Sequence, residues 1–363
     1  MRRLSLFGAT GSVGQSTLDL VRRDGEAWRV SVLTANSDVG ELARLALEFR
    51  PELVVIADEA RHGELKEALA GTNIGVAAGA EALIAAAKHP TDLVMAAIVG
   101  TAGLAPTMAA LEAGVAVALA NKEALVSSGE LMTAAARQSG ATILPADSEH
   151  NAIFQCLAGG RIDQVRRIIL TASGGPFRTM SAEAMAHVTP AQAVAHPNWS
   201  MGAKISVDSA TMMNKGLELI EAHHLFPVGL DRIEILVHPQ SVIHSLVEYV
   251  DCSTLAQLGS PDMRIPISSA LAWPQRMATP CAPLDLASIA RLDFEAPDEM
   301  RFPATALCRA AIAEGGARPA QLNAANEVAG AAFLAGRISF PAIVEAVRRV
   351  IEAEAPSVPV SLQ

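Results

Sequence analysis

Short aliphatic runs alternate with helical segments through the first 145 residues, and this pattern limits the possible folds most strongly. Residues 16–23 and 40–49 have helical periodicity, and the apolar runs are 4–7, 30–33, 53–56, 93–99, 115–119 and 142–144. Strands that are covered on both faces are continuously apolar, and helices between them connect parallel strands. We therefore predict an α/β fold in which residues 1–146 form a Rossmann-like parallel-sheet domain.

The pattern changes near residue 147, which indicates further domains. We expect a central α+β catalytic domain at 147–272, with antiparallel strands at 232–249 and 253–258. A proline-punctuated connecting segment follows at 273–298. Residues 299–363 are predicted to form a short C-terminal helical bundle, because the periodicity there is helical at 304–313, 320–334 and 340–353.

Composition excludes several classes of protein. The formal net charge of −10 leaves no basic footprint, so nucleic acid is not the expected partner. The uncharged stretch between Asp92 and Glu112 is divided by Gly100, Gly103 and Pro106, which argues against a membrane span. The four cysteines form no CxxC pair, so we expect a reducing, cytoplasmic location rather than a disulfide framework.

A glycine-rich turn directly follows the first predicted strand and opens a helix. Glycines let the backbone turn tightly and approach a pyrophosphate, and the helix N-terminus then faces the phosphates. This context predicts a dinucleotide site at Gly8, Thr10, Gly11, Ser12 and Val13.

The end of the second predicted strand leaves the choice of dinucleotide open. An NAD site usually has an acidic residue at this strand end, and the segment Thr34–Asp38 has none there, which favours NADP. However, no Arg or Lys is present to pair with a 2′-phosphate. Asn36 and Ser37 are the candidate hydrogen-bonding groups, while Asp38 adds a negative charge nearby.

Two carboxylates follow the apolar run 142–144. If that run is a strand, Asp147 and Glu149 project from the same side of the backbone, since side chains alternate along a strand. Two converging carboxylates make half a site for a hard cation such as Mg²⁺ or Mn²⁺. The alternative is a polar turn in which Ser148 or Glu149 caps the next helix.

A second dense group of polar residues lies in the central part of the chain. On a helix, Asn214, Lys215 and Glu218 share one face, and such a stripe can hold a phosphate beside a metal ligand. The alternative is a solvent-facing stripe with an ordinary surface ion pair.

Together, these motifs resemble 1-deoxy-D-xylulose 5-phosphate reductoisomerases over residues 1 to about 350. Eight blocks in the same order carry the resemblance: 8–14, 120–123, 147–151, 173–177, 196–202, 214–218, 238–241 and 322–327. The resemblance implies conversion of this sugar phosphate to 2-C-methyl-D-erythritol 4-phosphate, in the methylerythritol phosphate route to isoprenoid precursors. It also implies NADPH as the cofactor and a homodimer.

The resemblance assigns roles to individual residues. Asp147, Glu149 and Glu218 match the ligands of a divalent cation, which is Mg²⁺ or Mn²⁺ with Co²⁺ as a further candidate. Lys122 matches a lysine close to the reacting oxygens. The implied substrate contacts are Ser148, Ser173, His196, Ser209, Asn214 and Lys215, with Asn198, Trp199 and Met201 in a lid. Further cofactor contacts fall on Asn121, Glu123 and Gly202.

Two rival functions remain open at this point. A simple NADP-dependent aldehyde or semialdehyde dehydrogenase would have the same glycine turn but would need an activated cysteine. A catalytically inactive sugar-phosphate-binding protein would have lost a metal carboxylate or Lys215, and all of these are present.

Overall fold

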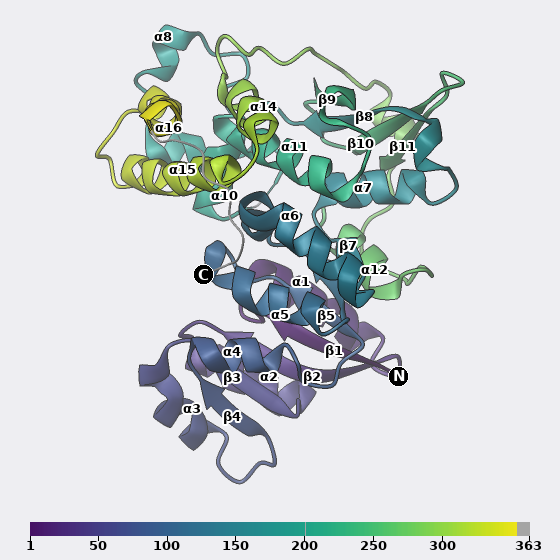
Figure 1. Cartoon of the computed structure of the whole chain (residues 1–363), viewed down its shortest axis with the longest axis vertical. Coiled ribbons are helices and arrows are strands. Elements are labelled where there is room, and N and C mark those ends of the chain that lie inside the picture. The colour runs from purple at the N-terminus through teal and green to yellow at the C-terminus, as the bar shows by residue number, and fades with distance from the viewer. Residues whose placement is uncertain (200, 354–363) are drawn as a thin grey trace. The chain divides into compact units, whose positions relative to one another are not determined.

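The computed structural model describes residues 1–199 and 201–353, which divide into two compact units (Figure 1). Within the described ranges, the first unit contains residues 1–151 and 263–281, and the second contains 152–199, 201–262 and 282–353. Among the helices of the described ranges, none has both the length and the apolar character that crossing a bilayer requires.

The first unit contains the predicted parallel sheet. Its seven strands have the order β4-β3-β2-β1-β5-β6-β7, and every neighbouring pair is parallel. The strands are β1 (Arg2–Phe7), β2 (Trp28–Ala35), β3 (Leu53–Ile56), β4 (Gly75–Ala78), β5 (Leu93–Ala96), β6 (Ala116–Leu119) and β7 (Ile143–Pro145). The α/β fold class is therefore confirmed. Strand β4 was missed because this edge strand contains a glycine and two alanines, which give almost no apolar signal.

Helices connect the strands of this sheet. They are α1 (Ser12–Arg23), α2 (Val39–Phe49), η1 (Glu59–Arg61), α3 (His62–Ala68), α4 (Ala80–Ala86), η2 (Thr101–Gly103), α5 (Leu104–Glu112) and α6 (Lys122–Ser139). The strand order reverses between β1 and β5, because β2 lies on one side of β1 and β5 on the other. Ligands of open α/β sheets bind at this switch point, and the turn after β1 leads directly to it.

A segment far along the chain completes the first unit. Helix α12 (Arg264–Ala272) packs against α1. Arg2 donates a hydrogen bond of 2.6 Å to the carbonyl of Leu271, and Arg264 forms an ion pair of 3.0 Å with Asp19. Residues 263–281 thus belong structurally with the parallel sheet, while the division at 146, 272 and 298 remains a prediction about domains.

The second unit contains a four-stranded sheet in the order β11-β10-β8-β9. Its strands are β8 (Val165–Ala172), β9 (Ile233–Val237), β10 (Ile243–Tyr249) and β11 (Thr254–Leu258). The range predicted to be strand at 232–249 contains two strands, β9 and β10, because a turn at 238–242 separates them. Strand β10 is antiparallel to both β8 and β11, whereas β9 runs parallel to β8. Strand β8 itself was not predicted from the sequence.

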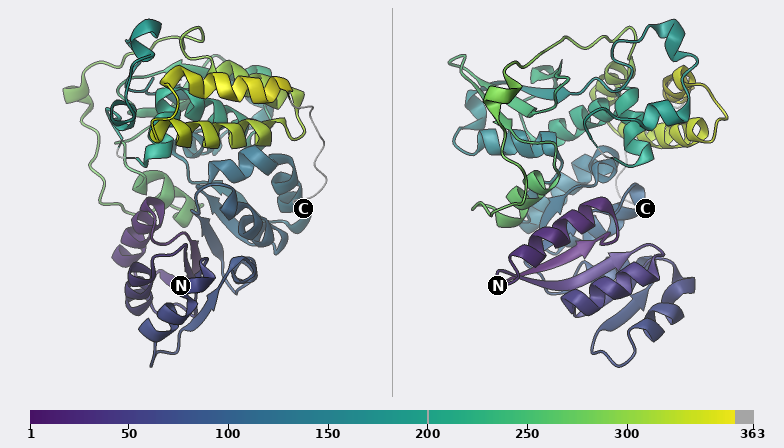
Figure 2. Two further views of the ribbon diagram at one scale, coloured as in Figure 1. Left: turned by 90° about the vertical axis from the view of Figure 1, so that its left-hand side faces the viewer. Right: turned by 180° about the vertical axis from the view of Figure 1, so that it is seen from behind.

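Helices complete the second unit. They are α7 (Ser148–Leu157), whose first turn belongs to the first unit, η3 (Ile162–Gln164), α8 (Ala182–Met185), α9 (Pro190–Val194), α10 (Ala203–Ala210), α11 (Met213–Leu225), η4 (Leu230–Arg232), α13 (Leu286–Ile289), α14 (Ala304–Glu314), α15 (Arg318–Leu334) and α16 (Phe340–Ala353). The left view of Figure 2 shows α15 and α16, in yellow, side by side. Phe340 of α16 meets both Phe177 and Phe333 edge-on, at 5.0 and 5.8 Å between ring centroids. Helices α15 and α16 therefore pack into the same hydrophobic core as the central part of the chain, while α14 packs against α11.

Candidate active site

The glycine turn after β1 has the geometry of a phosphate-binding loop. Gly8 has φ of +93°, and a Cβ there would lie 2.6 Å from the carbonyl oxygen of Ala97. A Cβ on Gly14 would lie 2.3 Å from the oxygen of Gly8, so the turn itself requires both glycines. Gly11, the N-cap of α1, has only one atom within 4 Å of such a Cβ, at 3.6 Å. The fold does not require a glycine there, whereas the close approach of a ligand would.

The segment after β2 contains the three residues considered for recognition of the 2′-phosphate. Asn36 and Ser37 are exposed just after this strand. Asp38 is the N-cap of α2, and its side chain accepts a hydrogen bond of 3.0 Å from the backbone N–H of Glu41. Its negative charge is thus stabilised by the positive end of a helix, which weakens its repulsion of a nearby phosphate.

Asn121 joins two loops at the carboxyl end of the sheet. Its Oδ1 caps α6 by accepting from the N–H of Ala124 at 2.9 Å, and its Nδ2 donates to the carbonyls of Ile98 and Gly100. The side chain thus ties the loop after β5 to the start of α6, which begins with the buried Lys122.

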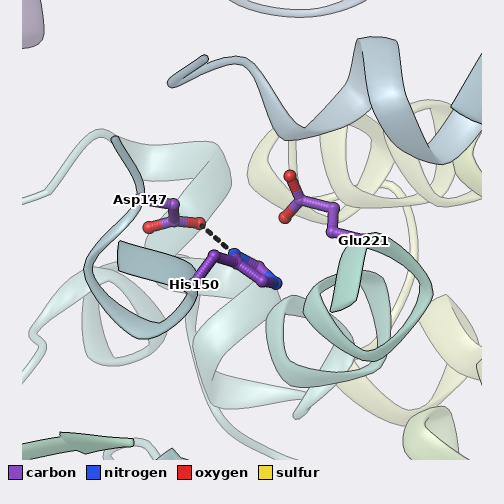
Figure 3. A group of neighbouring side chains, drawn as sticks. All are labelled: Asp147, His150 and Glu221. Carbon is purple, nitrogen blue, oxygen red and sulfur yellow. Dashed lines mark ion pairs between the residues drawn. The ribbon is translucent and has the colours of Figure 1, made fainter. Parts of the chain in front are cut away.

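Lys122 forms an ion pair with Asp147, which follows the end of β7. The Nζ–Oδ2 distance is 2.8 Å, and both side chains are largely buried. The imidazole Nδ1 of His150 lies 4.0 Å from the same oxygen, and Figure 3 shows this ring pointing at Asp147. Figure 3 also draws Glu221, which comes from α11. The ion pair with the buried Lys122 holds this carboxylate in a fixed orientation.

The geometric reason given above for pairing Asp147 with Glu149 was wrong. Strand β7 ends at Pro145 and α7 begins at Ser148, so Glu149 belongs to the first turn of a helix and strand alternation does not apply. Local hydrogen bonds orient the two carboxylates instead. The Ser148 N–H donates to Asp147 Oδ1 at 3.0 Å, and the Ser148 hydroxyl donates to Glu149 Oε2 at 2.6 Å. Asp147 thus accepts a backbone N–H at the start of α7, whereas the alternative had assigned the capping role to Ser148 or Glu149.

The polar residues on one face of α11 are at least partly buried and interact with one another. Asn214 Nδ2 and Lys215 Nζ hold the two carboxylate oxygens of Glu218, as predicted for residues that share one helix face. Lys215 and Glu218 are 4% and 1% exposed, so the surface-pair alternative was wrong. Met212, which precedes the helix, has φ of +63°, an uncommon conformation for a residue with a side chain.

Gly216 sets how closely α11 approaches α14. A Cβ at this position would lie 2.5 Å from Cys308 Sγ and 3.2 Å from the carbonyl oxygen of Ala304. Only glycine permits this separation, and the neighbouring Asn214, Lys215 and Glu218 take their positions from it.

The loop after β8 packs directly on the end of α10. Gly175 has φ of +69°, and a Cβ there would lie 2.7 Å from the carbonyl oxygen of Ser209. Ser173 Oγ accepts a hydrogen bond from the Gly175 N–H at 3.1 Å and lies 2.9 Å from His196 Nε2. The structure therefore brings Ser173, His196 and the backbone of Ser209 into one small region of the second unit.

His196 also orders the beginning of the predicted lid. Its Nδ1 accepts the backbone N–H groups of Asn198 and Trp199 at 3.2 and 3.0 Å. The ring proton must then reside on Nε2, which donates to Ser173. Burial lowers the pKa of His196 below its ordinary value, which is consistent with a neutral ring.

Support for the lid from the turn at 238–242 was not predicted. Asn198 Nδ2 donates to the carbonyl of Pro239 at 2.6 Å and lies 3.2 Å from Ser241 Oγ. The ring of Trp199 lies 5.9 Å from that of His244. These supporting residues belong to, or closely follow, the block at 238–241, whose role the sequence pattern did not reveal.

Among the described residues, two sets of three side chains are suited to hold a cation, and each side chain would provide one ligand atom. One set is Asp147, Glu149 and Glu218, and the other is Asp147, His150 and Glu221. His150 and Glu221 were not predicted as ligands. Their only sequence signal is position: His150 follows Glu149 directly, and Glu221 lies one turn beyond Glu218.

Comparison with known proteins identifies the family. Three family models match: 1-deoxy-D-xylulose 5-phosphate reductoisomerase at residues 4–129, its C-terminal domain at 143–226, and a further reductoisomerase C-terminal domain at 258–363. The reductoisomerase of Zymomonas mobilis is 58% identical over 100% of this chain and 93% of its own length, and that of Rhodospirillum centenum is 58% identical over 99% and 88%. The chain belongs to the 1-deoxy-D-xylulose 5-phosphate reductoisomerase family.

Solved structures of the family agree with this fold. The Zymomonas mobilis reductoisomerase in complex with NADPH has a TM-score of 0.95 at 56% identity and covers 99% of this chain and 94% of its own. A reductoisomerase with NADPH, fosmidomycin and magnesium has a TM-score of 0.94 at 46% identity and covers 98% and 90%.

The two buried thiols, Cys156 and Cys308, are unsuited to the nucleophilic role that the dehydrogenase alternative requires. Burial raises the pKa of Cys156 to about 11 and raises that of the fully buried Cys308 as well. Neither cysteine is therefore an activated nucleophile, because the reactive form of a cysteine is the thiolate.

Proposed function

We propose that this chain catalyses the metal-dependent rearrangement of 1-deoxy-D-xylulose 5-phosphate and its reduction by NADPH to 2-C-methyl-D-erythritol 4-phosphate. Family membership over the whole chain supports the reaction. The observation that supports the site most directly is the set of three carboxylates, Asp147, Glu149 and Glu218, which are suited to one hard cation.

The donor chemistry favours this set over the second one. Carboxylate oxygens suit Mg²⁺ and Mn²⁺, whereas the imidazole of His150 suits softer ions such as Zn²⁺. A structure of a relative also contains magnesium. The bound cation would polarise the substrate carbonyl, and the nicotinamide would supply the hydride for the final reduction.

The chain's own residues would bind and orient the substrate. Lys122, which is buried against Asp147, places a positive charge where oxygens of the substrate would lie beside the metal. Ser148 holds the Glu149 carboxylate in position, so it acts beside the metal as well as near the substrate.

The substrate phosphate would occupy the second unit. Lys215 and Asn214 now hold Glu218, and a phosphate would take over both donors while the cation takes the carboxylate. Ser173, Ser209 and the Nε2–H of His196 would complete the pocket. Binding energy from this non-reacting group can then orient the reacting carbons.

The lid would exclude water from the reaction. Asn198, Trp199 and Met201 lie between the pocket residue His196 and helix α10, and Asn198 is held by Pro239 and Ser241. Exclusion of water protects the reactive fragments that exist between cleavage and re-formation of the carbon–carbon bond.

The cofactor would bind at the switch point of the parallel sheet. The turn residues Gly8, Thr10, Gly11, Ser12 and Val13 would hold the pyrophosphate. Asn36 and Ser37 would bond the 2′-phosphate, and Asn121, Glu123 and Gly202 would contact the nicotinamide half.

We further propose a homodimer in the cytoplasm. The homodimer follows from the resemblance to the family. A reducing compartment is supported by the cysteines, all four of which are free in the structure. Cell fractionation that found the protein in an oxidising compartment would contradict the second part.

Metal dependence tests the proposed function. With deoxyxylulose phosphate, NADPH and Mg²⁺ or Mn²⁺, the wild-type protein should oxidise NADPH, and chelation should stop the reaction. Glu218→Gln should reduce kcat/KM by at least about 100-fold, since even residues that only support metal ligands contribute 10- to 100-fold. NADPH binding, followed by fluorescence, should change little.

Glu221→Gln is the matched comparison, because it makes the same change one turn later on α11. Glu221→Gln should reduce kcat/KM less than Glu218→Gln does, and its metal half-saturation concentration should be almost unchanged. If Glu221→Gln shifts the metal dependence more than Glu218→Gln does, the second set of ligands is the metal site and the proposed one is wrong.

A further inference from the structure

We propose that Asn326 is a positioning residue for the substrate phosphate, which it influences through Asp208 and helix α10. This inference rests on the phosphate pocket proposed above. Asn326 lies on α15 in the C-terminal bundle and is separated from Asp208 by 118 positions in the chain. Neither residue belongs to the proposed substrate or metal contacts.

The contact is a buried polar connection between two helices. Asn326 Nδ2 donates a hydrogen bond of 2.8 Å to Asp208 Oδ1, and the two residues are 1% and 3% exposed. The other carboxylate oxygen, Oδ2, lies 3.1 Å from Lys204 Nζ, whose side chain is 28% exposed. A buried carboxylate with a hydrogen bond on one side and an ion pair on the other has a fixed orientation.

The sequence of α10 does not favour this arrangement by itself. Lys204 lies in the first turn of the helix and Asp208 in the second half, so both charges oppose the helix dipole. The basic residue also precedes the acidic one at i,i+4, which is the weaker order for such a pair. The hydrogen bond from α15 therefore stabilises a charge that α10 alone would hold poorly.

Helix α10 connects this contact to the phosphate pocket. Ser209, a proposed phosphate contact, is the residue after Asp208, and its carbonyl packs against Gly175 in the loop that starts at Ser173. The spacing is tight, because a Cβ on Gly175 would lie 2.7 Å from that carbonyl oxygen. A small displacement of α10 would therefore change the separation of Ser173 from Ser209 and weaken the binding of a phosphate.

Asn323 provides a matched control within the same helix. It is one turn earlier on α15, is also 1% exposed and has the same side chain. Its amide, however, lies 3.2 Å from Glu327 Oε1 on its own helix. Replacing Asn323 therefore removes a buried asparagine from α15 without breaking the bond to α10.

The test is steady-state kinetics with deoxyxylulose phosphate. Asn326→Ala should raise the KM for this substrate about tenfold, as expected when one hydrogen bond to a buried charge is lost. Its kcat should stay within about threefold, because the metal and hydride sites are untouched. The dissociation constant for NADPH should change less than this KM, because Gly202, the proposed cofactor contact, caps the end of α10 that is farther from Asp208. Asn323→Ala should keep the wild-type KM.

A double-mutant cycle tests whether the effect passes through Asp208. Asp208→Ala should also raise the KM, and adding Asn326→Ala to it should raise the KM little further, since residues that act through one contact are not additive. Full multiplication of the two effects would overturn the proposal. If Asn326→Ala does not fold, as judged by its thermal unfolding, Asn326→Asp takes its place. That isosteric variant sets a second carboxylate against Asp208 and should raise the KM at least as much.

Other outcomes overturn the inference or the function separately. An unchanged KM for Asn326→Ala, or an equal rise for Asn323→Ala, would show that Asn326 only fills the core. A fall in kcat at constant KM would also contradict the inference. In contrast, a wild-type protein that cannot turn over the substrate refutes the proposed function, and a Lys215→Ala variant with an unchanged KM refutes the phosphate pocket.

Discussion

At the scale of single residues, His196 shows how the surroundings of one ring determine its chemistry. Nδ1 accepts two backbone N–H groups from the start of the lid, and Nε2 lies 2.9 Å from Ser173 Oγ. A protonated ring would present an N–H on Nδ1 to two other N–H donors. The neutral ring is therefore the form that holds the lid and the pocket together.

This geometry predicts a specific dependence on pH. The pKa of His196 is lowered in the folded protein by burial, so the unfolded chain binds the proton more readily. Its contribution to stability is present above the unfolded value and is lost as the pH falls through the folded pKa. We expect the KM for deoxyxylulose phosphate to rise across that same acidic window.

The KM measured from neutral to acidic pH in wild type and in His196→Gln checks this prediction. The variant should have a higher KM at neutral pH and should lose the acidic rise, because glutamine does not titrate. His187→Gln, at an exposed position, is the control and should retain the wild-type profile. A wild-type acidic rise that persists in His196→Gln would assign the titration to another group.

The metal residues illustrate what could be predicted at this scale. Asp147 and Glu149 were identified from their position after an apolar run and from oxygen-ligand chemistry, which depend only on local sequence. His150 and Glu221 were not, because a histidine or glutamate near a site is recognised as a ligand only when its neighbours in space are known. The role of Asp38 as a helix cap was not predicted either, since α2 was expected to begin at Gly40, one residue later than its first residue Val39.

At the scale of the helices and strands, Gly216 determines how α11 packs on α14. The proposed phosphate and metal residues Asn214, Lys215 and Glu218 surround this position on α11. The geometry of the site therefore depends on one point of close contact between helices, where the nearest side chain is Cys308.

Gly216→Ala should destabilise the protein by about 1–3 kcal/mol, the usual cost of forcing extra atoms into a packed core. The new Cβ would meet Cys308 Sγ at 2.5 Å, so α11 must move. Adding Cys308→Ala should restore part of the loss. Chemical denaturation measures both effects.

Gly330 on α15 gives the matched control for this substitution. It is also a glycine within a helix, but nothing lies within 4 Å of a Cβ built on it. Gly330→Ala should be neutral or stabilising by up to about 1 kcal/mol, since alanine favours helix over glycine. Equal destabilisation by the two substitutions would show that the contact with Cys308 is not the cause.

Prediction of these elements succeeded where the apolar pattern was strong. Continuous runs such as 53–56 and 93–99 were identified because strands buried on both faces need no alternation, although β5 occupies only 93–96 of the second run. Strand β8 was missed because its two arginines, Arg166 and Arg167, interrupt the apolar pattern. The parallel pairing of β8 with β9 could not be read from the sequence, since the strands are far apart in the chain.

At the scale of the whole molecule, the homodimer is the prediction to be checked. Sedimentation-equilibrium analysis of the purified protein should give twice the chain mass of 37.8 kDa at micromolar concentration. A mass of one chain over the whole concentration range would contradict the homodimer. Activity that is independent of dilution would support a tight assembly.

Because residues 263–281 belong to the first unit, this unit cannot complete its folding early in synthesis. The ribosome makes the N-terminus first, yet Arg2 bonds the carbonyl of Leu271 and Asp19 pairs with Arg264. The parallel sheet therefore emerges from the exit tunnel long before its last helix exists, with the face of α1 that α12 covers still uncovered. Domains that fold during synthesis usually complete themselves from the N-terminal side. Here, the first-made unit can finish only after most of the second has been translated, which leaves this face of α1 exposed in the interval.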